Sequence, residues 1–127
     1  MAEDVQIVRA LYESWQAGDT EAAFGDFAED IEWDARGIAL PGLNQVFTGH
    51  DGVRAFWRGW FEAWDELDFE ADEPVVREDG RVAVMIRQRN LSRGAGIWVD
   101  QPPYWFVWTL EGGKVTRVEF EWAEKRE

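Results

Sequence analysis

The chain has 127 residues, enough for one compact domain that buries roughly two thirds of the surface of its unfolded form. Its 26 acidic residues against 13 basic ones give a formal charge of −13, which disfavours nucleic acid and anionic membranes as partners. The lack of cysteine excludes disulfides, thiolate nucleophiles and cysteine-ligated metals. No segment has the ~20 apolar residues of a membrane span, and the acidic start Met1–Asp4 does not resemble a signal peptide. We therefore expect a cytoplasmic protein in which residues 1–127 form a single domain.

Apolar residues recur at helical spacing in the first half of the chain and predict three helices, at residues 4–17, 20–28 and about 51–65. Gly18 ends the first helix, and Asp19 is placed to cap the second. In the third helix most of the inward positions are aromatic, so this helix presents a broad, flat, apolar face. Such a face either closes an ordinary core or forms one wall of a cavity for an apolar ligand.

The rest of the chain predicts strands, at residues 31–34, 67–71, 75–76, 81–91, 97–110 and 114–122, and a loop at 36–47. Asp79-Gly80 between two valine-rich runs is a strong hairpin signal. Pro102-Pro103 interrupts one strand, so we expect a bend or bulge there. Helices followed by hairpin-linked strands indicate an α+β fold, in which the helices pack on one face of an antiparallel sheet.

Two of the predicted strands are apolar on both faces, at Val82–Ile86 and Tyr104–Trp108. An antiparallel sheet with one face in water should instead alternate apolar and polar residues. The second face therefore needs a cover, and no predicted helix is left to supply it. We expect a homodimer formed through this sheet face.

Four segments resemble a known family, in the order in which that family has them: Tyr12–Asp19 (YESWQAGD), Phe27–Trp33 (FAEDIEW), Gly49–Arg54 (GHDGVR) and Gly113–Phe120 (GKVTRVEF). They resemble the SnoaL-like (polyketide cyclase-type) branch of the nuclear transport factor 2-like superfamily. The resemblance implies a cone-shaped, cystatin-like roll, in which a curved antiparallel sheet wraps around three N-terminal helices. It also implies a pocket at the mouth of the cone, and members are often dimeric.

The superfamily contains isomerases, dehydratases, cyclases, epoxide hydrolases and non-catalytic binders, so the resemblance alone does not give the function. Ketosteroid isomerase-like members use a tyrosine and two acids, and only the acid after the first strand has a counterpart, Asp34. The other two positions hold Leu11 and either Trp105 or Phe106. The Asp-Arg-Asp set of limonene epoxide hydrolase-like members keeps only its arginine, Arg87.

Asp34 and His50 are the candidate general acids or bases. Asp34 follows Trp33 at a strand end near the expected mouth of the cone, where an indole and exclusion of water would raise the pKa of the carboxyl group. The alternative is a solvated acid or a partner of Arg36. His50 is the one histidine, and the alternative role for it is capping or packing at the start of the third helix.

Arg87 and Tyr104 are the candidates for stabilising an oxyanion or a ligand carbonyl. For Arg87 the alternative is cross-strand pairing with Glu119, Glu121 or Asp100. For Tyr104 it is an ordinary place in the core or at an interface.

Nine tryptophans are many for 127 residues, and large flat rings pack imperfectly against a curved sheet. We therefore expect a pocket for a hydrophobic small molecule, although the same rings could form an ordinary core. The expected ligand-binding residues are Tyr12, Trp15, Trp33, Trp57, Trp60, Phe61, Trp105, Trp108 and Phe120. One histidine without any cysteine does not predict a metal site, and no cofactor is expected.

Two functions are compatible with these features. The first is a cofactor-independent enzyme that isomerises, dehydrates or cyclises a hydrophobic cyclic carbonyl compound. The second is a binding module of the same fold that holds an apolar ligand or a protein partner without turnover. An ionisable group facing the pocket would favour the enzyme.

Overall fold

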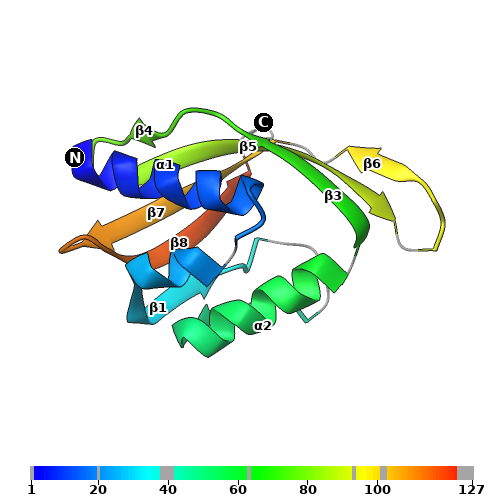
Figure 1. The fold of residues 1–127 in the computed structure, drawn as a ribbon, viewed down its shortest axis with the longest axis horizontal. Coiled ribbons are helices and arrows are strands. Elements are labelled where there is room, and N and C mark those ends of the chain that lie inside the picture. Colours follow the sequence, from blue (N-terminus) through cyan, green and yellow to red (C-terminus); the bar gives the residue numbers. More distant parts are fainter. Residues whose placement is uncertain are drawn as a thin grey trace.

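The computed structural model describes residues 2–19, 21–37, 42–62, 64–92, 94–100 and 103–122. The helices are α1 (Ala2–Gln16), the 3-10 helix η1 (Glu21–Asp26) and α2 (Gly49–Glu62). The strands are β1 (Phe27–Asp34), β2 (Val46–Thr48), β3 (Trp64–Ala71), β4 (Val75–Val76), β5 (Val82–Ser92), β6 (Trp98–Asp100), β7 (Tyr104–Glu111) and β8 (Lys114–Trp122). The predicted α+β fold is confirmed: a curved sheet carries α1 and α2 on one face (Figure 1).

The boundaries differ from the predicted ones in several places; β1 begins at Phe27 instead of Ile31, and Trp64, which was predicted to be helical, begins β3. The second helix is a short 3-10 helix, because Phe27 already pairs with Val115 in the sheet. The predicted loop at 36–47 contains the first two residues of β2, a short strand whose Phe47 pairs with Trp33 of β1. The predicted strand at 97–110 is divided into β6 and β7 before and after Pro103, while Pro102 lies outside the described residues.

The strands follow the order β2-β1-β8-β7-β5-β3, and β4 and β6 both pair with β5. The Asp79-Gly80 hairpin is present, since Val76 pairs with Val82. The expected all-antiparallel sheet is wrong in one pair, because β1 and β8 run parallel, with Trp33 opposite Val118. These two strands are joined by most of the chain rather than by a tight turn, so their relative direction is not fixed by a hairpin.

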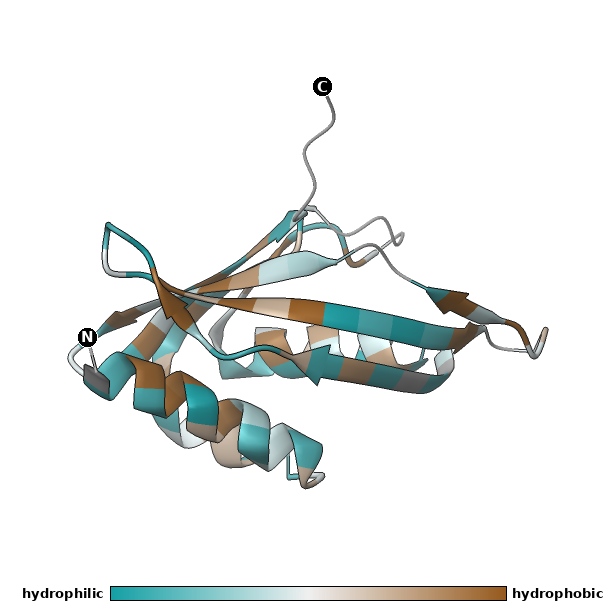
Figure 2. Cartoon of the chain, turned by 90° about the horizontal axis from the view of Figure 1, so that it is seen from above, coloured by the Kyte–Doolittle hydropathy of each residue, from teal (hydrophilic) through white to brown (hydrophobic). Residues whose placement is uncertain are grey.

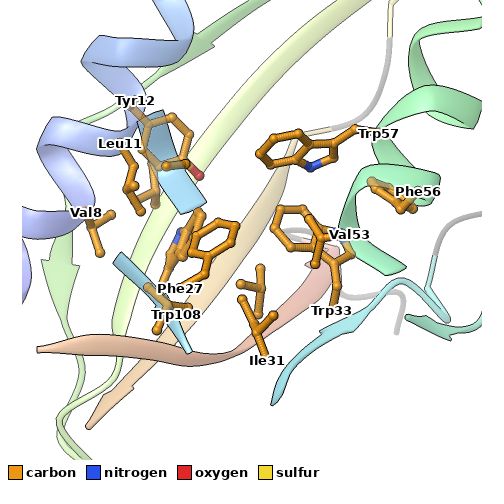
Figure 3. Close-up of a cluster of buried hydrophobic side chains, with 14 of the residues drawn as sticks. Val8, Leu11, Tyr12, Phe27, Ile31, Trp33, Val53, Phe56, Trp57 and Trp108 are labelled. Carbon is orange, nitrogen blue, oxygen red and sulfur yellow. The ribbon is translucent and has the colours of Figure 1, made fainter. Parts of the chain in front are cut away.

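The hydrophobic core fills the space between the sheet and the helices (Figure 3). Val8 and Leu11 of α1, Val53 and Phe56 of α2 and Trp108 of β7 are all buried. Trp108 lies at the centre of this core and is fully buried. The helical spacing that predicted α1 and α2 is therefore the spacing of their core-facing residues.

The opposite face of the sheet is partly closed within the single chain. Ala83 of β5 and Val107 of β7 lie opposite each other and are buried there. Close by, Arg77 makes two 3.1 Å hydrogen bonds with Glu121 and places its guanidinium 5.6 Å from the centre of the Trp105 ring. Less apolar surface is therefore left exposed on this face of the sheet than the sequence suggested. The homodimer through this face stays a prediction.

The hairpin of β5 and β6 extends beyond the helices, with exposed Ile97, Trp98 and Val99 near its end (Figure 2). Across the described part of the chain, no helix is both long enough and apolar enough to cross a bilayer.

Gly49 begins α2 with a φ of 77°, a left-handed conformation that glycine adopts without strain. We expect Gly49→Ala to lower the free energy of unfolding by about 1–2 kcal/mol, the cost of placing a Cβ in that conformation. Gly25→Ala is the matched control, because Gly25 has an ordinary φ and a Cβ there contacts nothing within 4 Å. Urea unfolding measures both variants, and equal stability of the two would contradict the expected strain at Gly49.

Candidate functional site

A cavity of about 250 Å³ lies between the two α-helices and the sheet. Its walls are mostly aromatic rings contributed by helices and strands from both halves of the chain: Tyr12, Trp15, Trp33, Phe56, Trp57, Trp60, Phe61, Phe69, Ile86, Gln88, Tyr104, Phe106 and Phe120. The volume is close to the lower end of the range for small-molecule pockets, roughly 300–1,000 Å³. The cavity suits a compact ring compound.

The spacing of the aromatic residues in α2 builds one wall. Phe56 and Trp60 are one helical turn apart and stack with ring centres 6.0 Å apart. Phe61 follows at the end of the helix and is half exposed, so it lies where the cavity meets solvent. On α1, Tyr12 and Trp15 are three residues apart and pack edge to face, with ring centres 5.1 Å apart.

On the strand wall, the side of the cavity formed by the sheet, three buried polar side chains are linked by hydrogen bonds. The Tyr104 hydroxyl donates a 2.5 Å hydrogen bond to Oε1 of Gln88, and Nε2 of Gln88 donates a 2.9 Å bond to Oδ1 of Asn90. All three side chains are buried, and Asn90 completely so. Gln88 and Asn90 are two residues apart on β5 and therefore face the same side as Ile86. Burial raises the pKa of Tyr104 well above its ordinary value, so this phenol stays neutral.

The α1 wall offers unused hydrogen-bond donors. The Tyr12 hydroxyl and Nε1 of Trp15 are buried, and neither has a hydrogen-bond partner among the described residues. Burial raises the pKa of Tyr12 strongly; the nearby Trp108 indole opposes this in part, and Tyr104 adds to it. Figure 3 shows the Tyr12 hydroxyl pointing away from α1, toward the interior. Tyr12 is therefore a neutral phenol and a hydrogen-bond donor, and it is not a base.

Asp34 faces away from this cavity. Trp33 points into the cavity, and successive strand residues point to opposite faces. The Asp34 carboxylate accepts hydrogen bonds from Nη2 of Arg36 at 2.7 Å and Nη2 of Arg117 at 2.6 Å. Arg36, and more weakly Arg117, lower the pKa of Asp34. This is the pairing with Arg36 that the sequence left as the alternative.

His50 and Arg87 also lie outside the cavity. Nε2 of His50 is 3.1 Å from the carbonyl oxygen of Phe27, and its ring packs against Phe24 at the start of α2. Arg87 is exposed on the other face of β5 from Gln88 and donates a 2.7 Å hydrogen bond to Asp72. It borders a second, shallower hollow of about 310 Å³ with charged walls. Of the four catalytic candidates, Tyr104 alone lines the aromatic cavity.

Seven of the nine expected ligand-binding residues line the cavity: Tyr12, Trp15, Trp33, Trp57, Trp60, Phe61 and Phe120. Trp105 lies on the opposite face of the sheet, beneath Arg77. Trp108 lies behind the lining, with its ring 5.7 Å from that of Tyr12.

Sequence reasoning missed five lining residues: Phe56, Phe69, Ile86, Gln88 and Phe106. Gln88 is the important omission, because it supplies a polar group to an aromatic wall. The signal was present, since Gln88 continues the alternation of Val84 and Ile86 along the inner face of β5.

The described lining residues include no charged side chain and no imidazole. Nor do the described residues contain a group of three or more histidine, aspartate or glutamate side chains able to hold a metal ion. The cavity thus offers apolar rings and a few neutral hydrogen-bonding groups.

Known proteins resemble this chain. An NTF2-like protein of unknown function from Burkholderia pseudomallei K96243 is 26% identical, with a TM-score of 0.82 over 96% of this chain and 92% of that one. The structure of TerC co-crystallised with polyporic acid is 22% identical, with a TM-score of 0.79 over 94% and 91% of the two chains. A Mesorhizobium loti protein described as a SnoaL-like polyketide cyclase is 23% identical, with a TM-score of 0.73 over 92% of this chain and 97% of that one. No curated protein matches the chain. The SnoaL-like domain family matches residues 8–118, and the chain therefore belongs to that family, as the sequence resemblance indicated.

Proposed function

We propose that this protein binds a flat, uncharged, hydrophobic ring compound that carries a carbonyl group, in the cavity between α1, α2 and the sheet. The observation that carries the proposal is an aromatic cavity in which the Tyr12 hydroxyl and the Trp15 indole have no acceptor among the described residues. A carbonyl oxygen supplies such an acceptor, and a buried donor left unpaired costs about 1–3 kcal/mol. The surrounding rings favour a flat apolar ligand.

The chemistry we propose is a cofactor-independent isomerisation, dehydration or cyclisation of this compound. In each reaction the carbonyl oxygen gains negative charge, which hydrogen-bond donors in a dry site stabilise. Tyr12 is the donor best placed for this role. Because the described lining lacks a carboxylate or an imidazole, we assign proton removal to water or to a basic group of the ligand. The similar protein described as a SnoaL-like polyketide cyclase favours an enzyme over the binding module, and the complex of TerC with polyporic acid supports a ring compound as the ligand.

The test uses α-tetralone, a bicyclic aromatic ketone, as the probe. We expect it to quench the fluorescence of the lining tryptophans and the protein to accelerate deuterium exchange at the carbon next to the carbonyl in heavy water. Phe61→Asp places a charge at the mouth of the cavity, which apolar ligands disfavour, and we expect affinity to fall about tenfold or more, with loss of the exchange.

Ile97→Asp is the matched control, because Ile97 is also exposed but lies on the hairpin beyond the helices. It should bind and exchange as the wild type does. If Phe61→Asp binds α-tetralone as tightly as Ile97→Asp, the probe occupies another site. Binding without any accelerated exchange would identify the binding module instead of the enzyme.

A further inference from the structure

We infer that the α1 wall and the strand wall of the cavity recognise different groups, with Tyr12 donating to a ligand carbonyl and Tyr104 accepting from a ligand hydroxyl, and that Gln88 sets this difference. The substrate class is then a neutral ring compound that carries both a carbonyl and a hydroxyl group. This inference rests on the proposed function, because it concerns the same cavity.

The hydroxyl proton of Tyr104 already takes part in a hydrogen bond within the protein. A phenol has one proton, and that of Tyr104 is donated to Oε1 of Gln88 over 2.5 Å. The orientation of the Gln88 amide is held by Asn90, whose Oδ1 accepts from Nε2 of Gln88 at 2.9 Å. The Tyr104 oxygen is left with acceptor capacity only.

A ligand hydroxyl matches the strand wall of the cavity. It can donate to the Tyr104 oxygen, and it can also accept the second amide hydrogen of Gln88, which lines the same wall. A ligand carbonyl has no proton to donate to the Tyr104 oxygen. It can only accept the hydrogen bond from the Gln88 amide. Gln88 is therefore the residue that determines which group the strand wall prefers.

The α1 wall has the opposite character. The buried Tyr12 hydroxyl has no partner in the part of the chain that the structure describes. The Trp108 indole beside it is itself a donor, so it cannot take the Tyr12 proton. Trp15 adds a second buried N–H without an acceptor there. The α1 wall offers donors and requires an acceptor from the ligand.

The cavity also selects for a neutral ligand. No charged side chain occurs among its described lining residues. Burial keeps both Tyr12 and Tyr104 protonated, since it raises the pKa of each phenol. A carboxylate ligand would lose its hydration without gaining a cation in return. The ligand class is thus a hydroxylated aryl ketone and excludes the corresponding acid.

The test measures dissociation constants, by tryptophan fluorescence, for α-tetralone (carbonyl only), α-naphthol (hydroxyl only) and an α-tetralone with a hydroxyl on its aromatic ring. Tyr12→Phe and Tyr104→Phe each remove a single hydroxyl group and so serve as controls for each other. We expect Tyr12→Phe to weaken α-tetralone about fivefold and to leave α-naphthol unchanged. Tyr104→Phe should do the reverse, and both variants should weaken the hydroxylated ketone.

Gln88→Met tests the assignment of Gln88. It removes the acceptor of the Tyr104 proton, so Tyr104 becomes free to donate, and the ratio of the dissociation constants for α-naphthol and α-tetralone should rise about fivefold. A general loss of packing would weaken both probes alike and leave the ratio unchanged. An unchanged ratio would therefore overturn the role of Gln88.

The outcomes separate the two proposals. If Tyr104→Phe weakens α-tetralone as much as α-naphthol, Tyr104 donates to the ligand and the inference fails, while the cavity function stands. If the wild type binds none of the three probes, the proposed function itself fails.

Discussion

Replacing Trp108 by alanine is expected to lower the free energy of unfolding by about 3–5 kcal/mol, the largest effect of any single substitution considered for this fold. The indole is fully buried, and its ring lies 5.8 Å from that of Trp15 and 6.1 Å from that of Trp33. Removing the indole leaves a cavity in the core. The neighbouring aromatic rings are rigid and held by their helix and strands, so they fill this cavity poorly. Urea unfolding followed by circular dichroism measures the loss.

Trp98→Ala is the matched control for Trp108→Ala. Trp98 is 39% exposed on β6, and the Arg89 guanidinium lies 4.6 Å from the centre of its ring. We expect this variant to lose less than about 1 kcal/mol. Comparable losses at the two positions would show that Trp108 is not the centre of the core. If Trp108→Ala does not fold, Trp108→Phe provides the smaller hole and an intermediate loss.

Asp34→Asn is expected to lower the free energy of unfolding by about 1–3 kcal/mol at neutral pH, because it removes hydrogen bonds from two arginines to a buried carboxylate. The arginines lower the pKa of Asp34 in the folded protein. A carboxyl group with a lowered pKa stabilises the fold fully above its unfolded pKa, and this contribution disappears as the pH falls through the folded value. The difference between wild type and variant should therefore shrink in acid.

Asp51→Asn is the control for this effect, since Asp51 is exposed and lies 3.4 Å from Arg54. Its loss should stay below about 0.5 kcal/mol at every pH. Binding of α-tetralone should be unchanged in Asp34→Asn, because Asp34 lies on the other face of the sheet. A variant that keeps its stability and loses the probe would instead place the carboxyl group at the cavity.

The fold could be predicted from the sequence where local signals were strong. The aromatic spacing of α2 and the Asp79-Gly80 hairpin depend on neighbours along the chain, and the structure contains both. The parallel pairing of β1 with β8 could not be predicted in this way, because it depends on where two distant segments meet. The resemblance to the family supplied the architecture that local patterns lacked.

The structure places more of the expected lining residues than of the expected catalytic residues around the cavity. Asp34 and Trp33 are adjacent, and which of them faces the cavity depends on one step of strand register. The alternation of apolar Ile31 and Trp33 with acidic Glu32 and Asp34 marks Trp33 as the inner residue, and the catalytic interpretation of Asp34 overlooked it. The position of Gln88 was accessible, because its alternation with Ile86 places it on the inner face of β5.

The parallel pair formed by the first and last strands has a consequence for biosynthesis. Phe27 pairs with Val115, and Asp34 pairs with Glu119, so this pair joins segments that lie far apart in the sequence, with β1 synthesised well before β8. Until β8 leaves the ribosome, β1 lacks this neighbour and the nascent domain cannot close its interior. Contacts so distant in sequence slow folding, so closure of this domain is expected to wait for the pairing of β1 with β8.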